Sequence, residues 1–246
     1  MKTAFLITAR LKSTRLAKKI ILEVMGKPLI VHMINRIKFA QKINRIVICT
    51  STNTQDDLLE EIAQKENIDC FRGSEEDVLQ RLLDSSKKFN LNYFANITAD
   101  VPMIDPFSVD YAIEEYNRTD ADLVLPPDHN LGGCMIVKVS SLEKVCKVKK
   151  ETNTECWVKF FEYQKQFKIH ILSNKKVKTN KFIKTSLDYF EDYVFINRIF
   201  NELDKPNQVF TTEDIINLVK AKPDLGKINS NSSHLKRWHN HRESTK

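Results

Sequence analysis

Short apolar runs alternate with segments of helical periodicity through the first half of this 246-residue chain. The runs have the length and composition of buried strands, and residues 45–50 (Arg-Ile-Val-Ile-Cys-Thr) are the clearest of them. The segments between them repeat apolar residues every three or four positions, as Leu29, Met33 and Ile37 do. Strands that alternate with helices in this way form βαβ units and a mainly parallel sheet. We therefore predict an α/β fold with three layers, in which helices cover both faces of a Rossmann-like sheet.

The predicted elements fill one domain. In the first half, we expect strands at residues 3–8, 45–50, 69–72, 93–98 and 122–125. The second half is less regular, with expected strands at residues 133–139, 168–172 and 182–187 and expected helices at residues 154–166, 188–203 and 212–220. From residue 223 the chain is basic, polar and poor in apolar periodicity. The prediction is a single domain over residues 1–222, followed by a frayed tail over residues 223–246.

The composition of the chain indicates its cellular environment and the kind of partner that it binds. Hydrophobic residues make up 41% of the chain, and no apolar run approaches the roughly 18 residues that a transmembrane helix needs. The cysteines are five in number and form no C-x-x-C pair, which argues against a disulfide framework. We expect a cytoplasmic protein with no membrane partner. The net charge of +7 favours anionic partners such as phosphates, acidic sugars or nucleic acid.

The segment that follows the first strand carries an unusual density of positive charge. In parallel sheets, ligands bind beyond the carboxyl ends of the strands, which here means this loop and the turns at residues 50–52, 72–74 and 98–100. Residues 10–19 (Arg-Leu-Lys-Ser-Thr-Arg-Leu-Ala-Lys-Lys) supply five cations and two hydroxyls. Arginine matches phosphate oxygens with its planar fork, and lysine adds a compact charge. The loop therefore suits a polyphosphate, although a merely solvated basic loop is the alternative.

Two common phosphate-binding motifs are absent from the sequence. There is neither a G-x-x-x-x-G-K-[S/T] loop nor a G-x-G-x-x-G fingerprint. The chain has only five glycines. Phosphate binding must therefore depend on side chains more than on a glycine cradle.

Four blocks, in a fixed order, carry a family resemblance. They are residues 7–19 (Ile-Thr-Ala-Arg-x-x-Ser-Thr-Arg-Leu-x-x-Lys), 26–30 (Gly-Lys-Pro-Leu-Ile), 71–81 (Phe-Arg-Gly-Ser-Glu-Glu-Asp-Val-Leu-Gln-Arg) and 97–106 (Ile-Thr-Ala-Asp-Val-Pro-Met-Ile-Asp-Pro). Together they resemble the spore-coat polysaccharide cytidylyltransferase family, which is related to the CMP-sialic acid and CMP-Kdo synthetases. The resemblance implies a fold of the nucleotide-diphospho-sugar transferase type. It also implies a Mg²⁺-dependent enzyme that transfers CMP from CTP to a sugar, releases pyrophosphate and serves surface polysaccharide or glycoconjugate synthesis.

The resemblance also implies roles for particular residues. The nucleotide-binding residues that it implies are Ala9, Arg10, Ser13, Arg15 and Lys19 for the triphosphate and Thr50, Ser51, Arg72, Gly73 and Ser74 for cytosine. The implied catalytic residues are Arg10, Lys19 and Asp100, the implied substrate-binding residues are Gln80 and Arg81, and the implied Mg²⁺ ligands are Asp100 and Asp188. A carboxylate at a strand end also suits a turn, and Asp188 also suits the N-cap of the following helix, with Glu191 completing a capping box.

The chain departs from the family pattern in the first loop and on the sugar side. Lys12 stands where the family has Gly, and Ala17-Lys18 stands where it has Pro-Gly. The family's Asp-Thr-Pro-Glu-Asp motif is replaced at residues 188–192 by Asp-Tyr-Phe-Glu-Asp, and its Arg-Glu-His segment is not recognisable around residues 151–157. The sugar pocket is therefore expected to be unusual or rebuilt.

Three functions remain open at this stage. The first is CMP transfer to an acidic sugar such as a nonulosonate. The second is nucleotidyl transfer to a sugar phosphate or another phosphorylated alcohol. The third is an inactive nucleotide-binding or nucleic-acid-associated protein, although no nucleic acid is expected because the usual recognition motifs are missing. Relatives are often homodimers, so a homodimer is the default expectation.

Overall fold

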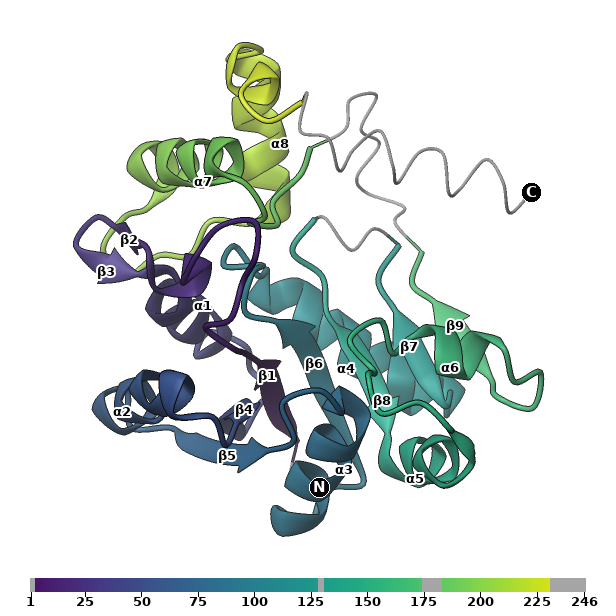
Figure 1. Cartoon of the computed structure of the whole chain (residues 1–246). Helices are drawn as coiled ribbons and strands as arrows, with labels where there is room; N and C mark the ends of the chain where they lie inside the picture. Colours follow the sequence, from purple (N-terminus) through teal and green to yellow (C-terminus); the bar gives the residue numbers. More distant parts are fainter. Residues whose placement is uncertain (1–2, 128–130, 174–182, 231–246) are drawn as a thin grey trace.

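A seven-stranded sheet forms the centre of the molecule (Figure 1). The computed structural model describes residues 3–127, 131–173 and 183–230. The strand order is β5-β4-β1-β6-β8-β7-β9. The strands are β1 (Ala4–Thr8), β4 (Arg45–Ser51), β5 (Asp69–Gly73), β6 (Tyr93–Thr98), β7 (Leu123–Leu125), β8 (Met135–Lys138) and β9 (Ile169–Ile171). Strand β8 runs antiparallel to both neighbours, and the other strands of this sheet run parallel to one another. The predicted mainly parallel sheet is confirmed.

Helices cover both faces of this sheet. The helices of the described residues are α1 (Leu29–Ile37), α2 (Asp57–Lys65), α3 (Val78–Lys88), α4 (Pro106–Thr119), α5 (Val139–Val148), the short α6 (Lys159–Glu162), α7 (Phe190–Leu203) and α8 (Thr212–Ala221), and the last two pack in a separate, smaller core. Strand β5 shows which helices lie on which face, because neighbouring residues of a strand point to opposite sides. Arg72 reaches Glu60 of α2, whereas Gly73 packs against Arg81 of α3. Helix α5 packs on α3, and α4 lies with α1 on the side of α2, so the predicted three layers are confirmed (Figure 1).

A second, smaller apolar core lies under α7 and α8, where these helices pack with the two-stranded ribbon of β2 (Glu23–Val24) and β3 (Lys27–Pro28). Its buried side chains include Phe195, Ile199 and Phe200 of α7 and Ile215 of α8. Residues 223–230, which we assigned to the tail, pack against this unit. A 3-10 helix at Leu225–Lys227 contacts α7, and Asn229 is only 3% exposed. The rest of the predicted tail, residues 231–246, lies outside the described residues.

The second half of the chain differs from the prediction in two helices. The helix predicted at residues 154–166 is wrong, because only α6 is helical in that stretch. Thr154 is fully buried against the start of α3: its N–H donates to the carbonyl of Glu76, and its hydroxyl accepts the N–H of Leu79. These contacts hold the chain in a non-helical path. Helix α5 was not predicted, because its valines favour strands in isolation.

Residues 183–187, where we expected most of a strand, have no regular secondary structure; residue 182 lies outside the described residues. The segment is nevertheless held firmly. Ile183 and Leu187 are buried in the smaller core, and the N–H of Leu187 donates to the carbonyl of Asp100 over 2.7 Å. The apolar pattern there reflects burial and not a strand.

Gly132 lies between β7 and β8 in a conformation that excludes a side chain. Its φ is +69°, and a Cβ at this position would lie 2.7 Å from the carbonyl oxygen of Met103. We expect Gly132→Ala to lower the free energy of unfolding by about 3 kcal/mol and the Tm by about 6–12 °C. Gly26→Ala is the matched control, because Gly26 has φ +72° but no atom within 4 Å of a Cβ. It should lose less than about 1 kcal/mol, because the strain of an L-residue is partly offset by the lost freedom of glycine in the unfolded chain; equal losses in thermal melts of the two variants would contradict the steric argument.

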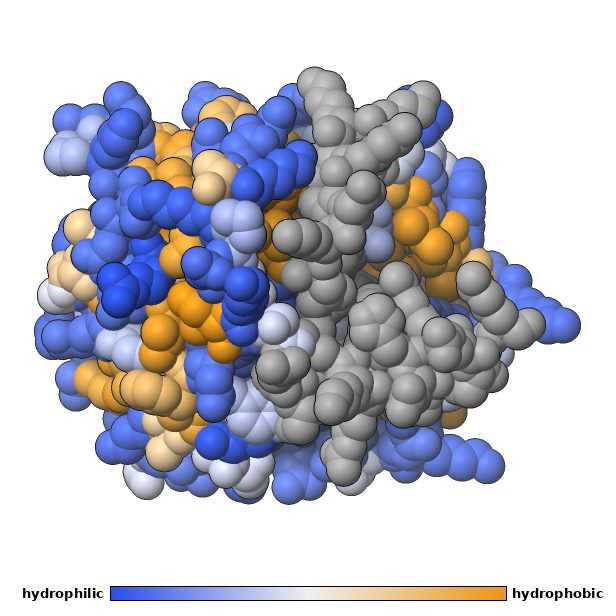
Figure 2. All heavy atoms as spheres, turned by 90° about the horizontal axis from the view of Figure 1, so that it is seen from above, coloured by the Kyte–Doolittle hydropathy of each residue, from blue (hydrophilic) through white to orange (hydrophobic). Residues whose placement is uncertain are grey.

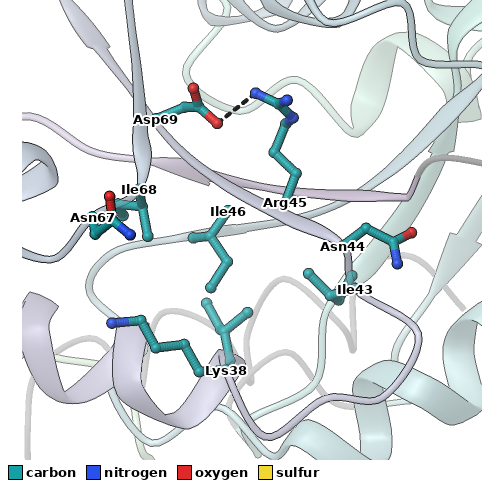
Figure 3. Close-up of a pocket in the computed structure, with 9 residues that line it drawn as sticks. Lys38, Ile43, Asn44, Arg45, Ile46, Asn67, Ile68 and Asp69 are labelled. Carbon is teal, nitrogen blue, oxygen red and sulfur yellow. Dashed lines mark hydrogen bonds and ion pairs between the residues drawn. The ribbon is translucent and has the colours of Figure 1, made fainter.

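A cavity of about 340 Å³ opens at the amino ends of β4 and β5, next to the end of α1 (Figure 3). Its charged lining residues are already paired. Arg45 lies 2.5 Å from Asp69, and Lys38 lies 3.1 Å from Glu66. Ligands of parallel sheets bind at the opposite, carboxyl end of the strands, which is where a functional site is expected.

Candidate active site

The first loop leaves the carboxyl end of β1 and passes beside the start of α7 (Figure 1). Backbone bonds hold its base to the neighbouring strand ends: Ala9 N–H donates to Cys49, and Ala99 N–H donates to Thr8. A buried carboxylate adds a third attachment. Asp56 is 0% exposed and accepts the N–H of Leu11 over 2.8 Å and the hydroxyl of Ser51 over 2.5 Å. The start of the loop therefore has a fixed position relative to β4.

Sequence reasoning missed Asp56. The adjacent Asp56 and Asp57 look alike in the sequence, and only the fold shows that one is buried and the other is exposed. The one signal in the sequence that Asp56 is buried was Ser51, whose hydroxyl at the end of the preceding strand can donate to a carboxylate.

Lys19, at the end of the loop, lies between two carboxylates. Its Nζ is 2.7 Å from Oδ2 of Asp100 and 3.2 Å from Oδ1 of Asp188, and it donates to the carbonyl of Leu187 over 2.6 Å. The Lys19 side chain is only 12% exposed. Thr98 donates to the other oxygen of Asp100, so this carboxylate also stabilises its own turn. The structure thus brings together three of the predicted residues from segments about 80 positions apart.

Three positively charged side chains, those of Arg15, Lys19 and Lys184, surround the carboxylate of Asp188. Burial alone would raise the pKa of its carboxyl, but the nearby charges of Lys19, Lys184 and Arg15 outweigh burial and hold the pKa below its ordinary value. Arg15 lies 2.5 Å from its Oδ1. The alternative role as a helix N-cap is wrong.

The cap of α7 is formed by its neighbours instead. Tyr189 is the N-cap of α7, and Asp192, not Glu191, completes the capping box. Asp192 accepts the backbone N–H groups of Asp188 and Tyr189. The Asp188 carboxylate is thereby left to pair with Lys19, Arg15 and Lys184.

Two other cations of the loop, Arg10 and Lys12, also pair with carboxylates. Arg10 lies 2.6 Å from Glu155, and Lys12 lies 2.9 Å from Glu75. Hydrogen bonds from Lys12 and then Asn53 lower the pKa of Glu75. Ser13 is half-buried in the same turn. A phosphate that binds Arg10 would therefore replace a carboxylate partner that already holds this side chain in place.

Lys18 occupies the position where the resembled family has glycine. Its φ is +51°, in the left-handed region that favours glycine, and its carbonyl accepts the N–H of Ile21. The turn keeps a glycine-like backbone although the residue is lysine.

The predicted cytosine-binding residues lie together at the ends of β4 and β5. Thr50 is fully buried, and its hydroxyl has no partner among the described residues. The Arg72 guanidinium donates to the carbonyls of Ser51 and Asn53 and pairs with α2. Ser74 accepts the N–H of Asp77. Arg72 therefore shapes the turn after β4. The hydroxyls and backbone groups at these strand ends are the candidates for contacts with a nucleobase.

The two predicted substrate-binding residues take different positions. Arg81 is 1% exposed and donates to the carbonyls of Ser74 and Glu75, and burial lowers its pKa. It supports the turn after β5 from beneath. Gln80 bonds Asp84 on the surface of α3 over 2.7 Å. Neither residue joins the cluster around Lys19.

The carboxylates of Asp100 and Asp188 fit a hard cation. They contact one ammonium nitrogen from two sides, and Mg²⁺ commonly takes one or two carboxylates and completes its shell with phosphate oxygens and water. Within residues 3–127, 131–173 and 183–230, no group of three or more His, Cys, Asp or Glu side chains is arranged to hold a metal ion. In that part of the chain, the donor set suits a metal shared with a polyphosphate and not an all-protein cage.

Figure 2 looks down on the end of the molecule that carries α7 and α8. On its left half, hydrophilic side chains surround smaller apolar patches. None of the helices in the described residues is long and apolar enough to cross a lipid bilayer.

The strand order, the single antiparallel strand and the polar cluster at the carboxyl ends define an α/β protein with the nucleotide-diphospho-sugar transferase fold. A family model described as cytidylyltransferase matches residues 4–221. The chain belongs to the cytidylyltransferase family.

Known proteins of this kind match nearly the whole chain. The spore coat polysaccharide biosynthesis protein SpsF of Bacillus subtilis is 26% identical over 236 residues, covering 89% of this chain and 95% of SpsF. A cytidylyltransferase structure from Leptospira borgpetersenii superposes with a TM-score of 0.83 at 28% identity, covering 92% of this chain and 96% of that one. The structure of CMP:2-keto-3-deoxy-manno-octonic acid synthetase complexed with CTP shares the fold, with a TM-score of 0.67 at 14% identity and coverage of 82% and 99%.

Proposed function

We propose that this protein transfers CMP from CTP to a hydroxyl of an acidic sugar, such as a nonulosonate, with release of pyrophosphate and with Mg²⁺ as cofactor. The observation that supports this most strongly is the contact of Lys19 with Asp100 and Asp188. A cationic loop and two carboxylates meet there at the carboxyl edge of the sheet, as binding of a metal–triphosphate complex requires. The product would serve surface polysaccharide or glycoconjugate synthesis.

In the proposed reaction, the cations of the first loop bind the phosphates of CTP. The sugar hydroxyl attacks the α-phosphorus of CTP, the bond to the pyrophosphate oxygen breaks, and the proton of the hydroxyl passes to solvent. Arg10, Arg15 and Lys19 bind phosphate oxygens and stabilise the negative charge that grows on the leaving pyrophosphate. To do so they exchange the carboxylates of Glu155, Asp188 and Asp100 for phosphate.

Asp100 and Asp188 are the proposed Mg²⁺ ligands. When bound, Mg²⁺ would neutralise phosphate charge and lower the pKa of a coordinated hydroxyl. The fixed position of Asp100 beside Lys19 keeps the two carboxylates from separating, because a shared cation offsets their mutual repulsion. Lys19 therefore prepares the site before any ligand arrives.

Separate observations support cytosine as the nucleobase and an acidic sugar as the acceptor. For cytosine, the ends of β4 and β5 offer the turn shaped by Arg72, the partly exposed Gly73 and the exposed Ser74, whereas the Thr50 hydroxyl is fully buried and would act on this turn from within. For the acceptor, the synthetase that shares this fold acts on a keto acid sugar by its name, and an acidic sugar suits the net charge of +7. Gln80 is exposed enough to contact an acceptor, whereas Arg81 would act by supporting the turn after β5.

A pyrophosphate-release assay tests the proposal. Each of the four nucleoside triphosphates is combined with a panel of sugar acids, with and without Mg²⁺, and the product masses are measured. We expect release only with CTP, a sugar acid and Mg²⁺, and a product in which one phosphate joins cytidine to sugar. A diphosphate-linked product would instead support transfer to a sugar phosphate. No turnover, together with salt-sensitive RNA binding, would support the nucleic-acid alternative.

A further inference from the structure

A buried lysine lies directly behind the proposed metal-binding carboxylates. The Lys184 side chain is only 3% exposed, and its Nζ lies 3.2 Å from Oδ2 of Asp188 and bonds Oδ2 of Asp192. A buried ammonium is strongly destabilising unless carboxylates compensate it. Lys184 therefore belongs to an ion-paired network and is not a surface cation.

Asp192 connects this lysine to the backbone around it. It is 0% exposed, and its Oδ2 accepts the N–H groups of Asp188 and Tyr189, each over 3.0 Å. Its Oδ1 accepts the Asn229 side chain over 3.0 Å, and the same amide also donates to the carbonyl of Lys184. Segments around residues 184, 190 and 229 are thus held together by polar groups that are almost completely buried.

The two carboxylate oxygens of Asp188 face different partners, one in the first loop and one in the interior of the protein. Oδ1 contacts Arg15 and Lys19 of the first loop, whereas Oδ2 contacts Lys184. One oxygen is thereby held by the interior of the protein, and the other is directed toward the loop. Without Lys184, the buried carboxylates of Asp188 and Asp192 would lose the cation that they share and would repel each other.

We propose that Lys184 is a positioning residue for the metal site: by binding Oδ2 of Asp188 and being held itself by Asp192 and Asn229, it orients Oδ1 toward the divalent cation. This inference rests on the proposed function, in which Asp188 is a ligand. Partners behind a metal ligand usually contribute about 10-fold to 100-fold to metal affinity. Lys184 thus acts through Asp188 and contacts neither nucleotide nor metal.

The test measures binding of Mn²⁺ by electron paramagnetic resonance, with CTP present, alongside steady-state kinetics at varied Mg²⁺. We expect Lys184→Met to weaken Mn²⁺ binding about 10-fold to 100-fold and to raise the Mg²⁺ concentration needed for half-maximal rate by a similar factor. Lys184→Arg keeps the charge but must fit a larger guanidinium into a site that is only 3% exposed, so it should restore only part of the affinity. Asn229→Ala, which removes only the outer support, should shift the affinity in the same direction but by a few-fold.

Lys149→Met is the matched control. Lys149 is also a buried lysine, with a side chain 8% exposed, and it pairs with Asp77 near the start of α3 and not with the cluster around Lys19. It should lose stability without any change in Mn²⁺ affinity. Equal Mn²⁺ affinity in folded Lys184→Met and wild type would overturn the positioning role and leave the proposed function standing. If Lys184→Met does not fold, unchanged affinity in Asn229→Ala would overturn it. Absence of Mn²⁺ binding and turnover in the wild type would overturn the proposed function as well.

Discussion

Asp100→Asn is expected to reduce kcat by about 10³-fold with little change in thermal stability. The carboxylate is one of two proposed metal ligands, and its loss removes several kcal/mol of stabilisation from the charged transition state. Asparagine keeps the size of the side chain and can still bond Thr98, and Asp100 is 24% exposed, so folding should depend little on its charge. The measurement is pyrophosphate release at saturating CTP and sugar.

Asp120→Asn provides the control for Asp100→Asn. Asp120 also forms a 2.7 Å ion pair with a lysine, Lys138, but its side chain is 78% exposed and follows α4, outside the cluster around Lys19. Its turnover should equal that of the wild type. A kcat of Asp100→Asn within tenfold of the wild type would exclude a direct role of this carboxylate.

Lys19→Met is expected to lower kcat/KM for CTP by about 10²-fold to 10³-fold, which is the usual effect of removing one preorganised donor from a developing negative charge. It also leaves Asp100 and Asp188 facing each other without their shared cation. Lys19→Arg should recover little activity, because a wide planar fork does not fit where a compact ammonium contacts three oxygens. The measurement is initial rate against CTP concentration.

Lys12→Met is the comparison within the same loop. Lys12 is 54% exposed and pairs with Glu75, so removal of its charge should change kcat/KM less than about fivefold. Similar losses in Lys12→Met and Lys19→Met would mean that only the total charge of the loop matters, and the assigned role of Lys19 would then be wrong.

β1, β4 and β6 were predictable because a buried parallel strand is a mostly apolar run. Strand β5 (Asp-Cys-Phe-Arg-Gly) is a half-buried edge strand without this pattern, and its place followed from its position between two helical segments and before Gly73. The regular alternation with helices also placed the strand ends, and with them the loop, the turns and Asp100. The antiparallel direction of β8 was not predictable, since the direction of a strand depends on its tertiary neighbours. Helix α5 was missed because packing against α3 overrides the strand preference of its valines.

The sequence indicated most of the charged groups of the site but not the residues that pair with them or hold them in place. The cations of the loop and Asp100 follow strands directly, so their place was visible in the sequence. Their partners were not, because Glu155 and Glu75 come from segments remote in the sequence. Asp56, Lys184 and Asn229 were missed for another reason: they are polar residues that the fold buries, and apart from Ser51 near Asp56, their sequence surroundings do not distinguish them from surface residues.

The left-handed backbone of Lys18 has an evolutionary consequence. An L-residue in this conformation is strained by about 1 kcal/mol, whereas glycine avoids the strain but loses a similar amount of free energy through its greater freedom in the unfolded chain. Exchange between the two residues should therefore be nearly neutral for folding. Descendants of a common ancestor can gain or lose a positive charge at this exposed turn without disturbing the loop, and selection there can act on electrostatics alone.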